Sequence, residues 1–172
     1  GSTSATSAMD VCRVQEDSAW VIDGSDPLFP THICDTPSDG EWLVRELNLY
    51  LKKNLSRPFR SICDILYEGL AEIHKEYLKL PHAEELCDLE MPNACCAVVR
   101  VRHERLFYYV LGNCEIVVSF HDGTSKSICD LRLQELDARL LQISQDLRQK
   151  QRMPLFRARN FMDHLLVENR VR

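Results

Sequence analysis

The chain has 172 residues, which is enough for one domain with a sizeable hydrophobic core. Hydrophobic residues make up 45% of the chain and charged residues 27%, and the net charge is −5 at pH 7. This composition excludes the clustered surplus of Lys and Arg that a nucleic-acid-binding surface needs, and no apolar run approaches the ~20 residues of a membrane-spanning helix.

The first predicted element is a β-hairpin. Residues 1–8 form a lead of small residues, Ser and Thr, which we expect to be a tag or a disordered terminus ahead of one domain at 9–172. Two β-prone runs follow, at 11–14 and 19–22, and the polar residues between them predict a turn. The second strand is predicted to end at Asp23 and Gly24. Residues 25–37 contain three prolines and no periodicity, which indicates a loop.

Two helices are predicted next. Ser38 and Glu41 have the spacing of a capping box, and apolar residues recur at helical spacing from there to about residue 56. A second helix is predicted from about residue 61 to residue 80, where Pro81 ends it.

Four further β-prone runs, at 94–101, 106–111, 115–120 and 124–129, are separated by short turns and predict an antiparallel meander. Helical spacing returns between Leu133 and Leu147 with Asp130 as a predicted N-cap, and Pro154 predicts the start of a last helix. Because strands and helices come in runs, we expect an α+β fold in which an antiparallel sheet packs against antiparallel helix pairs.

The eight cysteines favour a reducing compartment. They include no CxxC pair and no grouping with zinc-finger spacing, and most lie within apolar runs. We expect buried, free thiols in a cytoplasmic protein. The basic residues between 148 and 172 are predicted to form a solvated helical face.

Several short segments resemble a known family. Residues 9–14, the polar turn and the strand at 19–24 are similar to the opening hairpin of the metal-dependent protein phosphatases of type 2C, in particular a compact bacterial branch. Residues 108–114 are similar to the family's Leu-Gly-Asp-Ser turn, with Asn113 and Cys114 in place of Asp and Ser, a change we interpret as structural drift. The resemblance covers nearly the whole chain from Met9 and implies an incomplete α-β-β-α sandwich.

The resemblance also implies a chemistry. Family members hydrolyse phosphoserine and phosphothreonine in proteins with two Mg²⁺ or Mn²⁺ ions and a bridging water, and such hard cations take oxygen ligands. By position, Asp10 and Asp23 match metal-ligating carboxylates and Gly24 matches a residue that offers its backbone carbonyl. The residues alone also allow Asp23 and Gly24 to be an ordinary turn. Glu16 and Asp17 are interpreted as the hairpin turn.

The resemblance further implies that the remaining metal carboxylates lie on later strands, and this sequence ends at Arg172 before such a motif. We therefore expect a domain truncated at its C-terminus, with weak or no metal binding and no turnover by itself. A homodimer through the unpaired sheet edge is then expected, and neither nucleic acid nor membrane as a partner. The alternatives are a pseudophosphatase or interaction module on the same fold, and an unrelated α+β protein.

Overall fold

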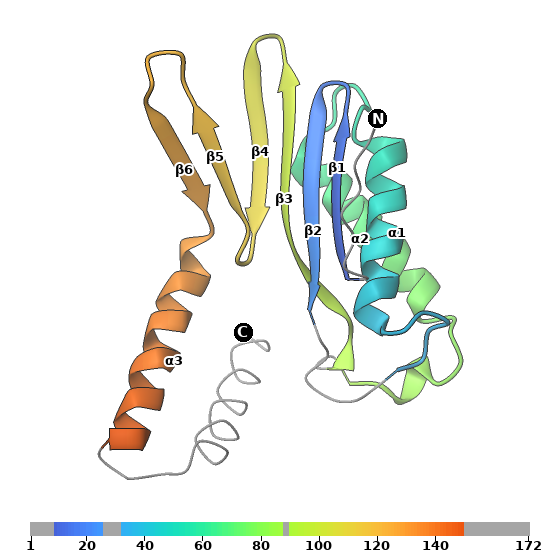
Figure 1. The fold of residues 1–172 in the computed structure, drawn as a ribbon. Coiled ribbons are helices and arrows are strands. Elements are labelled where there is room, and N and C mark those ends of the chain that lie inside the picture. Colours follow the sequence, from blue (N-terminus) through green and yellow to red (C-terminus); the bar gives the residue numbers. More distant parts are fainter. Residues whose placement is uncertain (1–8, 26–31, 88–89, 150–172) are drawn as a thin grey trace.

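The computed structural model describes residues 9–25, 32–87 and 90–149 (Figure 1). The predicted lead at 1–8 and the predicted helix from Pro154 lie outside these ranges. The fold is α+β, as expected: four strands form one antiparallel sheet, two strands form a second, and two of the helices pack on the larger sheet. The elements are β1 (Asp10–Gln15), β2 (Ser18–Ser25), α1 (Asp39–Asn54), α2 (Ile62–Tyr77), η1 (Ala83–Glu85), β3 (Asn93–Arg102), β4 (Arg105–Leu111), β5 (Glu115–Ser119), β6 (Ser125–Cys129) and α3 (Leu131–Gln149).

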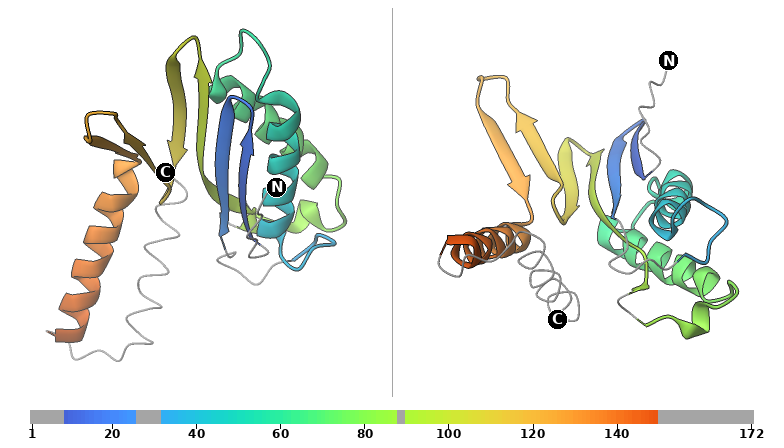
Figure 2. Two further views of the ribbon diagram at one scale, coloured as in Figure 1. Left: turned by 45° about the horizontal axis from the view of Figure 1, so that its top comes forward. Right: turned by 60° about the horizontal axis from the view of Figure 1, so that its bottom comes forward.

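The larger sheet has the strand order β1-β2-β3-β4. The hairpin β1–β2 forms as predicted, and Glu16 turns the chain with φ +40°. Strand β2 then pairs antiparallel with β3, although α1 and α2 lie between these strands in the sequence. This arrangement leaves both helices on one face of the sheet (Figure 2).

Local signals set the starts of both helices. The Ser38 hydroxyl accepts a hydrogen bond from the Glu41 N–H at 3.1 Å, which caps α1 as the spacing predicts. A complete capping box, with both reciprocal hydrogen bonds, caps α2 at Ser61 and Asp64. Helix α2 ends at Tyr77, a few residues before the predicted boundary at residue 80.

The core lies between the helices and the sheet. Trp20 and Ile22 of β2 and Val98 of β3 are almost fully buried, and they pack with Leu51 of α1 and Ile65 of α2. Alternation along the strands makes these residues face the helices, so burial of their apolar surface is the main stabilising term of the fold.

The predicted four-stranded meander is wrong at one junction. Strands β3 and β4 pair, but β5 and β6 form their own two-stranded sheet. Gly112 turns the chain at the end of β4 with φ +83°, and its N–H donates to the Asp130 carboxylate at 3.3 Å instead of to a neighbouring strand. The same carboxylate accepts from the Arg132 N–H at 3.2 Å, so Asp130 starts α3 as predicted.

None of the eight cysteines forms a disulfide bond in the described ranges, in agreement with the sequence analysis. The expectation that they are buried holds only for Cys96, because Cys12, Cys63 and Cys87 are exposed and the other four are half-buried. Within the described ranges, no helix combines the length and the apolar character that crossing a membrane requires.

Candidate functional site

The predicted ligands Asp10 and Asp23 lie side by side. Asp10 begins β1, Asp23 stands near the end of β2, and the two are direct cross-strand partners. Side chains of such partners point to the same face with Cβ atoms about 4.5–5.5 Å apart. The hairpin therefore brings the two carboxylates together at one end of the sheet.

The two carboxylates repel each other. Burial raises the pKa of the Asp23 carboxyl, and the hydrogen bond with Asp10 and the negative charge of Asp10 raise this pKa further. A hydrogen bond with the Asn113 side chain lowers the pKa of Asp23. A carboxyl group whose ionisation is disfavoured by a neighbouring negative charge lies at a place where a cation is electrostatically favourable.

Asn113 is a member of this site that the sequence analysis missed. It follows Gly112 in the β4–β5 turn, and its side chain hydrogen-bonds to Asp23. Gly112 allows this turn to lie close to β3, because a Cβ at this position would overlap Cys95, the cross-strand partner of Asp23. Asn113 therefore contacts the acidic pair directly, a contact that its interpretation as structural drift did not include. The sequence signal that could have identified Asn113 is a polar residue next to a glycine that directly follows a strand.

Two further groups adjoin the pair. The Ser25 hydroxyl hydrogen-bonds to the Asn93 side chain in the next row of the sheet. Burial and the nearby Cys95 and Asp23 raise the pKa of the Cys114 thiol to about 11. Cys114 is therefore a neutral thiol at pH 7 and not a nucleophile.

Gly24 has a packing role that is separate from its predicted role as a carbonyl donor. Its N–H donates to the Met9 carbonyl at 2.9 Å. A Cβ at Gly24 would meet Val44 Cγ2 at 2.8 Å and the Gly40 carbonyl oxygen at 3.2 Å. Glycine is therefore required here for the close packing of α1 on β2.

The other acidic residues of the N-terminal region lie elsewhere. Glu16 and Asp17 form the turn at the far end of the hairpin, as predicted, and Asp17 lies 3.6 Å from Arg102. Asp39 is more than a favourable charge at a helix N-terminus. It is 1% exposed and accepts hydrogen bonds from the N–H groups of Ile33 and Cys34, both at 3.1 Å, and from the Tyr77 hydroxyl at 2.6 Å.

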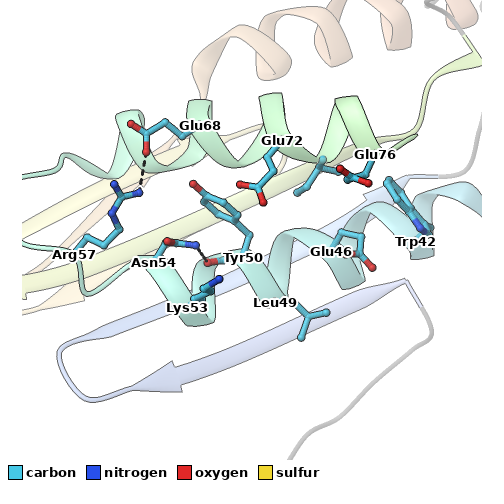
Figure 3. A pocket seen from close by; sticks show the side chains of 11 residues that line it. Trp42, Glu46, Leu49, Tyr50, Lys53, Asn54, Arg57, Glu68, Glu72 and Glu76 are labelled. Carbon is cyan, nitrogen blue, oxygen red and sulfur yellow. Dashed lines mark hydrogen bonds and ion pairs between the residues drawn. The ribbon is translucent and has the colours of Figure 1, made fainter. Parts of the chain in front are cut away.

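A hollow of the described surface lies away from this site. A groove of about 460 Å³ runs between α1 and α2, with Trp42, Tyr50 and Ile73 among its lining residues (Figure 3). Its charged walls are partly neutralised, since Arg57 pairs with Glu68 at 2.9 Å. It includes neither Asp10 nor Asp23, so we do not assign the acidic site to it.

The acidic site offers few metal ligands. Among residues 9–25, 32–87 and 90–149, no group of three or more His, Cys, Asp and Glu side chains is placed to hold a metal ion. Comparisons with protein-family models, curated proteins and solved structures found no match for the chain. The resemblance to type 2C phosphatases therefore remains a prediction from the sequence.

Proposed function

We propose that this chain carries part of the active site of a metal-dependent phosphoprotein phosphatase of the type 2C kind, acting in the cytoplasm on phosphoserine or phosphothreonine. The observation that supports this most is the cross-strand pair of Asp10 and Asp23 with its raised Asp23 pKa. Carboxylates that repel each other at neutral pH gain most from a shared divalent cation.

The oxygen donors of this site suit Mg²⁺ or Mn²⁺. Asp10 and Asp23 would hold the metal with their carboxylates, and the Gly24 carbonyl is a third oxygen donor on the same strand. Asn113 would orient the Asp23 carboxylate through its hydrogen bond. When bound, the metal supplies positive charge for the phosphate group and an activated water for its hydrolysis. Two carboxylates give weak affinity, of about millimolar Kd.

A pseudophosphatase or interaction module is the second candidate function. It is favoured by the small number of acidic groups at the site, because the described ranges place no set of three metal-ligand side chains together. In that case Asp10 and Asp23 are an unused remnant, and the fold serves to present surfaces to partners.

Hydrolysis of p-nitrophenyl phosphate by the full-length protein, with and without Mn²⁺, separates the two functions. We expect activity that a chelator abolishes and that Asp23→Asn lowers by more than about 100-fold, since even outer residues of metal sites contribute about 10–100-fold. Asp17→Asn, at the other end of the same hairpin, is the matched control and should retain activity. Full activity in Asp23→Asn contradicts the site, and inactivity of the unmodified protein in excess metal favours the pseudophosphatase.

A further inference from the structure

The loop between α1 and α2 presents a phenylalanine to solvent. Phe59 is fully exposed, so nothing in the described part of the chain covers its ring. Its φ is +61°, in the left-handed region that strains a bulky side chain. Pro58 and Phe59 lie together in a turn, and a β-turn with Pro first and a positive φ second normally has Gly at the second position. The chain therefore places an exposed aromatic residue where glycine would relieve the strain.

Two arginines of β3 hold this loop in place. Arg100 donates to the Leu55 and Arg60 carbonyls at 2.8 and 2.7 Å, and Arg102 donates to two further loop carbonyls at 2.5 and 3.3 Å. Arg100 is buried, and burying a charge is unfavourable unless hydrogen bonds compensate it. Here those hydrogen bonds go to the backbone of the loop. The strained Phe59 is thus held rigidly in its exposed position, as a preorganised contact residue would be.

Basic residues surround this loop, although the chain as a whole is acidic. The Gln15 side chain donates to the Lys52 carbonyl at 3.4 Å, and Arg102 lies 3.6 Å from Asp17, so the α1–α2 loop meets the β1–β2 and β3–β4 turns at one end of the molecule (Figure 1). We call this part the Phe59 end. Its basic residues are Lys52, Lys53, Arg57, Arg60, Arg100, Arg102 and Arg105, and its acidic residues are Glu16, Asp17, Asp64, Glu68 and Glu104. Seven basic and five acidic residues give it a charge of +2, whereas the whole chain carries −5.

We propose that the Phe59 end docks on an anionic lipid surface. The Phe59 ring enters the boundary between headgroups and acyl chains, and the surrounding Lys and Arg side chains lie close to the lipid phosphates. Binding of a protein to such a surface depends on the apolar area buried in the interface and on the attraction between basic residues and anionic lipids. The Phe59 end provides both, and its contact with the bilayer is peripheral.

The size of the apolar contact favours a lipid surface over a protein partner. A specific protein interface buries about 800 Å² on each partner, whereas one aromatic side chain buries about 150–250 Å². A protein partner would also need a preformed pocket for the protruding ring, but a bilayer encloses a protruding apolar group without one. The binding is expected to be reversible and no tighter than the ~10⁴ M⁻¹ of a single myristoyl chain.

Docking through the Phe59 end leaves the acidic site accessible. Asp10 and Asp23 lie at the opposite end of the β1–β2 hairpin from Glu16 and Asp17, so they face away from the lipid. The proposal does not depend on the proposed phosphatase function. It departs from the expectation in the sequence analysis that a membrane is not a partner.

Co-sedimentation with sucrose-loaded vesicles tests the docking. Vesicles of phosphatidylcholine with about 30% phosphatidylserine should bind the unmodified chain at least about 5-fold more tightly than phosphatidylcholine alone, and salt at about 1 M, where the Debye length is about 3 Å, should remove this difference. Phe59→Gly should lower the affinity for the anionic vesicles by at least about 5-fold, because it removes the inserted ring. Leu78→Gly is the matched control, since Leu78 is an exposed apolar residue at the other end of α2, and it should bind like the unmodified chain.

The stability of Phe59→Gly separates a contact role from a structural role. Glycine adopts φ +61° without strain, so Phe59→Gly should leave Tm unchanged or raise it while vesicle binding falls. A lower Tm of this variant would show that the ring stabilises the fold and would contradict a contact role.

Phe59→Trp provides a direct signal of insertion. Trp20 and Trp42 are buried, so the indole introduced at position 59 is the exposed fluorophore of the described chain. Its emission should shift to shorter wavelength when vesicles with phosphatidylserine are added, and binding should match that of the unmodified chain. An unshifted emission, no binding of the unmodified chain to these vesicles, or equal binding by Phe59→Gly overturns the proposal. In that case a protein partner with a pocket for the ring becomes the better explanation of the exposed Phe59.

Discussion

Asp10→Asn should make this protein more stable at pH 7, although it removes a residue of the proposed site. Asp10 and Asp23 are cross-strand neighbours, and their mutual repulsion contributes to the raised pKa of Asp23. Asparagine keeps the size of the side chain and removes one of the two charges. The change therefore relieves repulsion without creating a cavity.

The size of the effect follows from the geometry. Two unit charges about 5 Å apart repel by about 1 kcal/mol in water and by about 3 kcal/mol at an effective dielectric constant of 20. Asp10 is exposed and Asp23 is only half-buried, so solvent screening favours the lower value. We expect a gain of about 1 kcal/mol, or an increase of about 2–4 °C in Tm for a chain of this size.

The pH dependence identifies the cause. The pKa of Asp23 is higher in the folded than in the unfolded state. Ionised Asp23 therefore destabilises the folded state at pH values above its folded pKa, and this destabilisation disappears as the pH falls from the folded pKa to the unfolded pKa. The difference in Tm between Asp10→Asn and the unmodified chain should therefore shrink as the solution is acidified. Thermal unfolding followed by circular dichroism from pH 7 to pH 3 measures this. A lower or unchanged Tm of Asp10→Asn at pH 7 would refute the reasoning.

Three further predictions concern the fold. Tyr77→Phe should cost about 2 kcal/mol in urea unfolding, because it removes a buried hydrogen bond to a charged group. Burial alone would raise the pKa of Asp39, but its hydrogen bonds with Tyr77, Cys34 and Ile33 outweigh burial and lower this pKa. The stabilisation by the Tyr77–Asp39 hydrogen bond should therefore be present at neutral pH and lost as pH falls through the lowered pKa of Asp39. An effect of Tyr77→Phe that does not change with pH would contradict this. Gly24→Ala should cost about 1–3 kcal/mol in the same assay through its clash with α1, and an unchanged stability would show that α1 moves away easily. Thiol titration of the denatured chain should find eight free thiols, and a lower number would indicate disulfides.

The parts of the fold that depend on neighbours in the sequence were predictable. Polar residues between two β-prone runs predict the β1–β2 hairpin, and the turn at Glu16 then fixes the pairing of Asp10 with Asp23. The helices have caps and apolar periodicity, and both formed close to the predicted residues.

The parts of the fold and of the site that depend on contacts between residues far apart in the sequence were not predictable. A strand pattern does not say which strand it pairs with, so the separation of β5 and β6 from the larger sheet depends on the Gly112 turn and its hydrogen bond to Asp130. The hydrogen bond between Asn113 and Asp23 joins residues far apart in the sequence. The three donors to Asp39 come from two segments, one of them α2, so no local pattern predicts its burial.

Binding of Mn²⁺ to the purified chain tests the central claim most directly. Electron paramagnetic resonance of free Mn²⁺ during a titration should give a Kd of about 1 mM for the unmodified chain. Asp23→Asn should abolish this binding, and Asp17→Asn, at the far end of the hairpin, should leave it unchanged. Binding of equal strength in the unmodified chain and in Asp23→Asn would contradict a metal site at the Asp10–Asp23 pair.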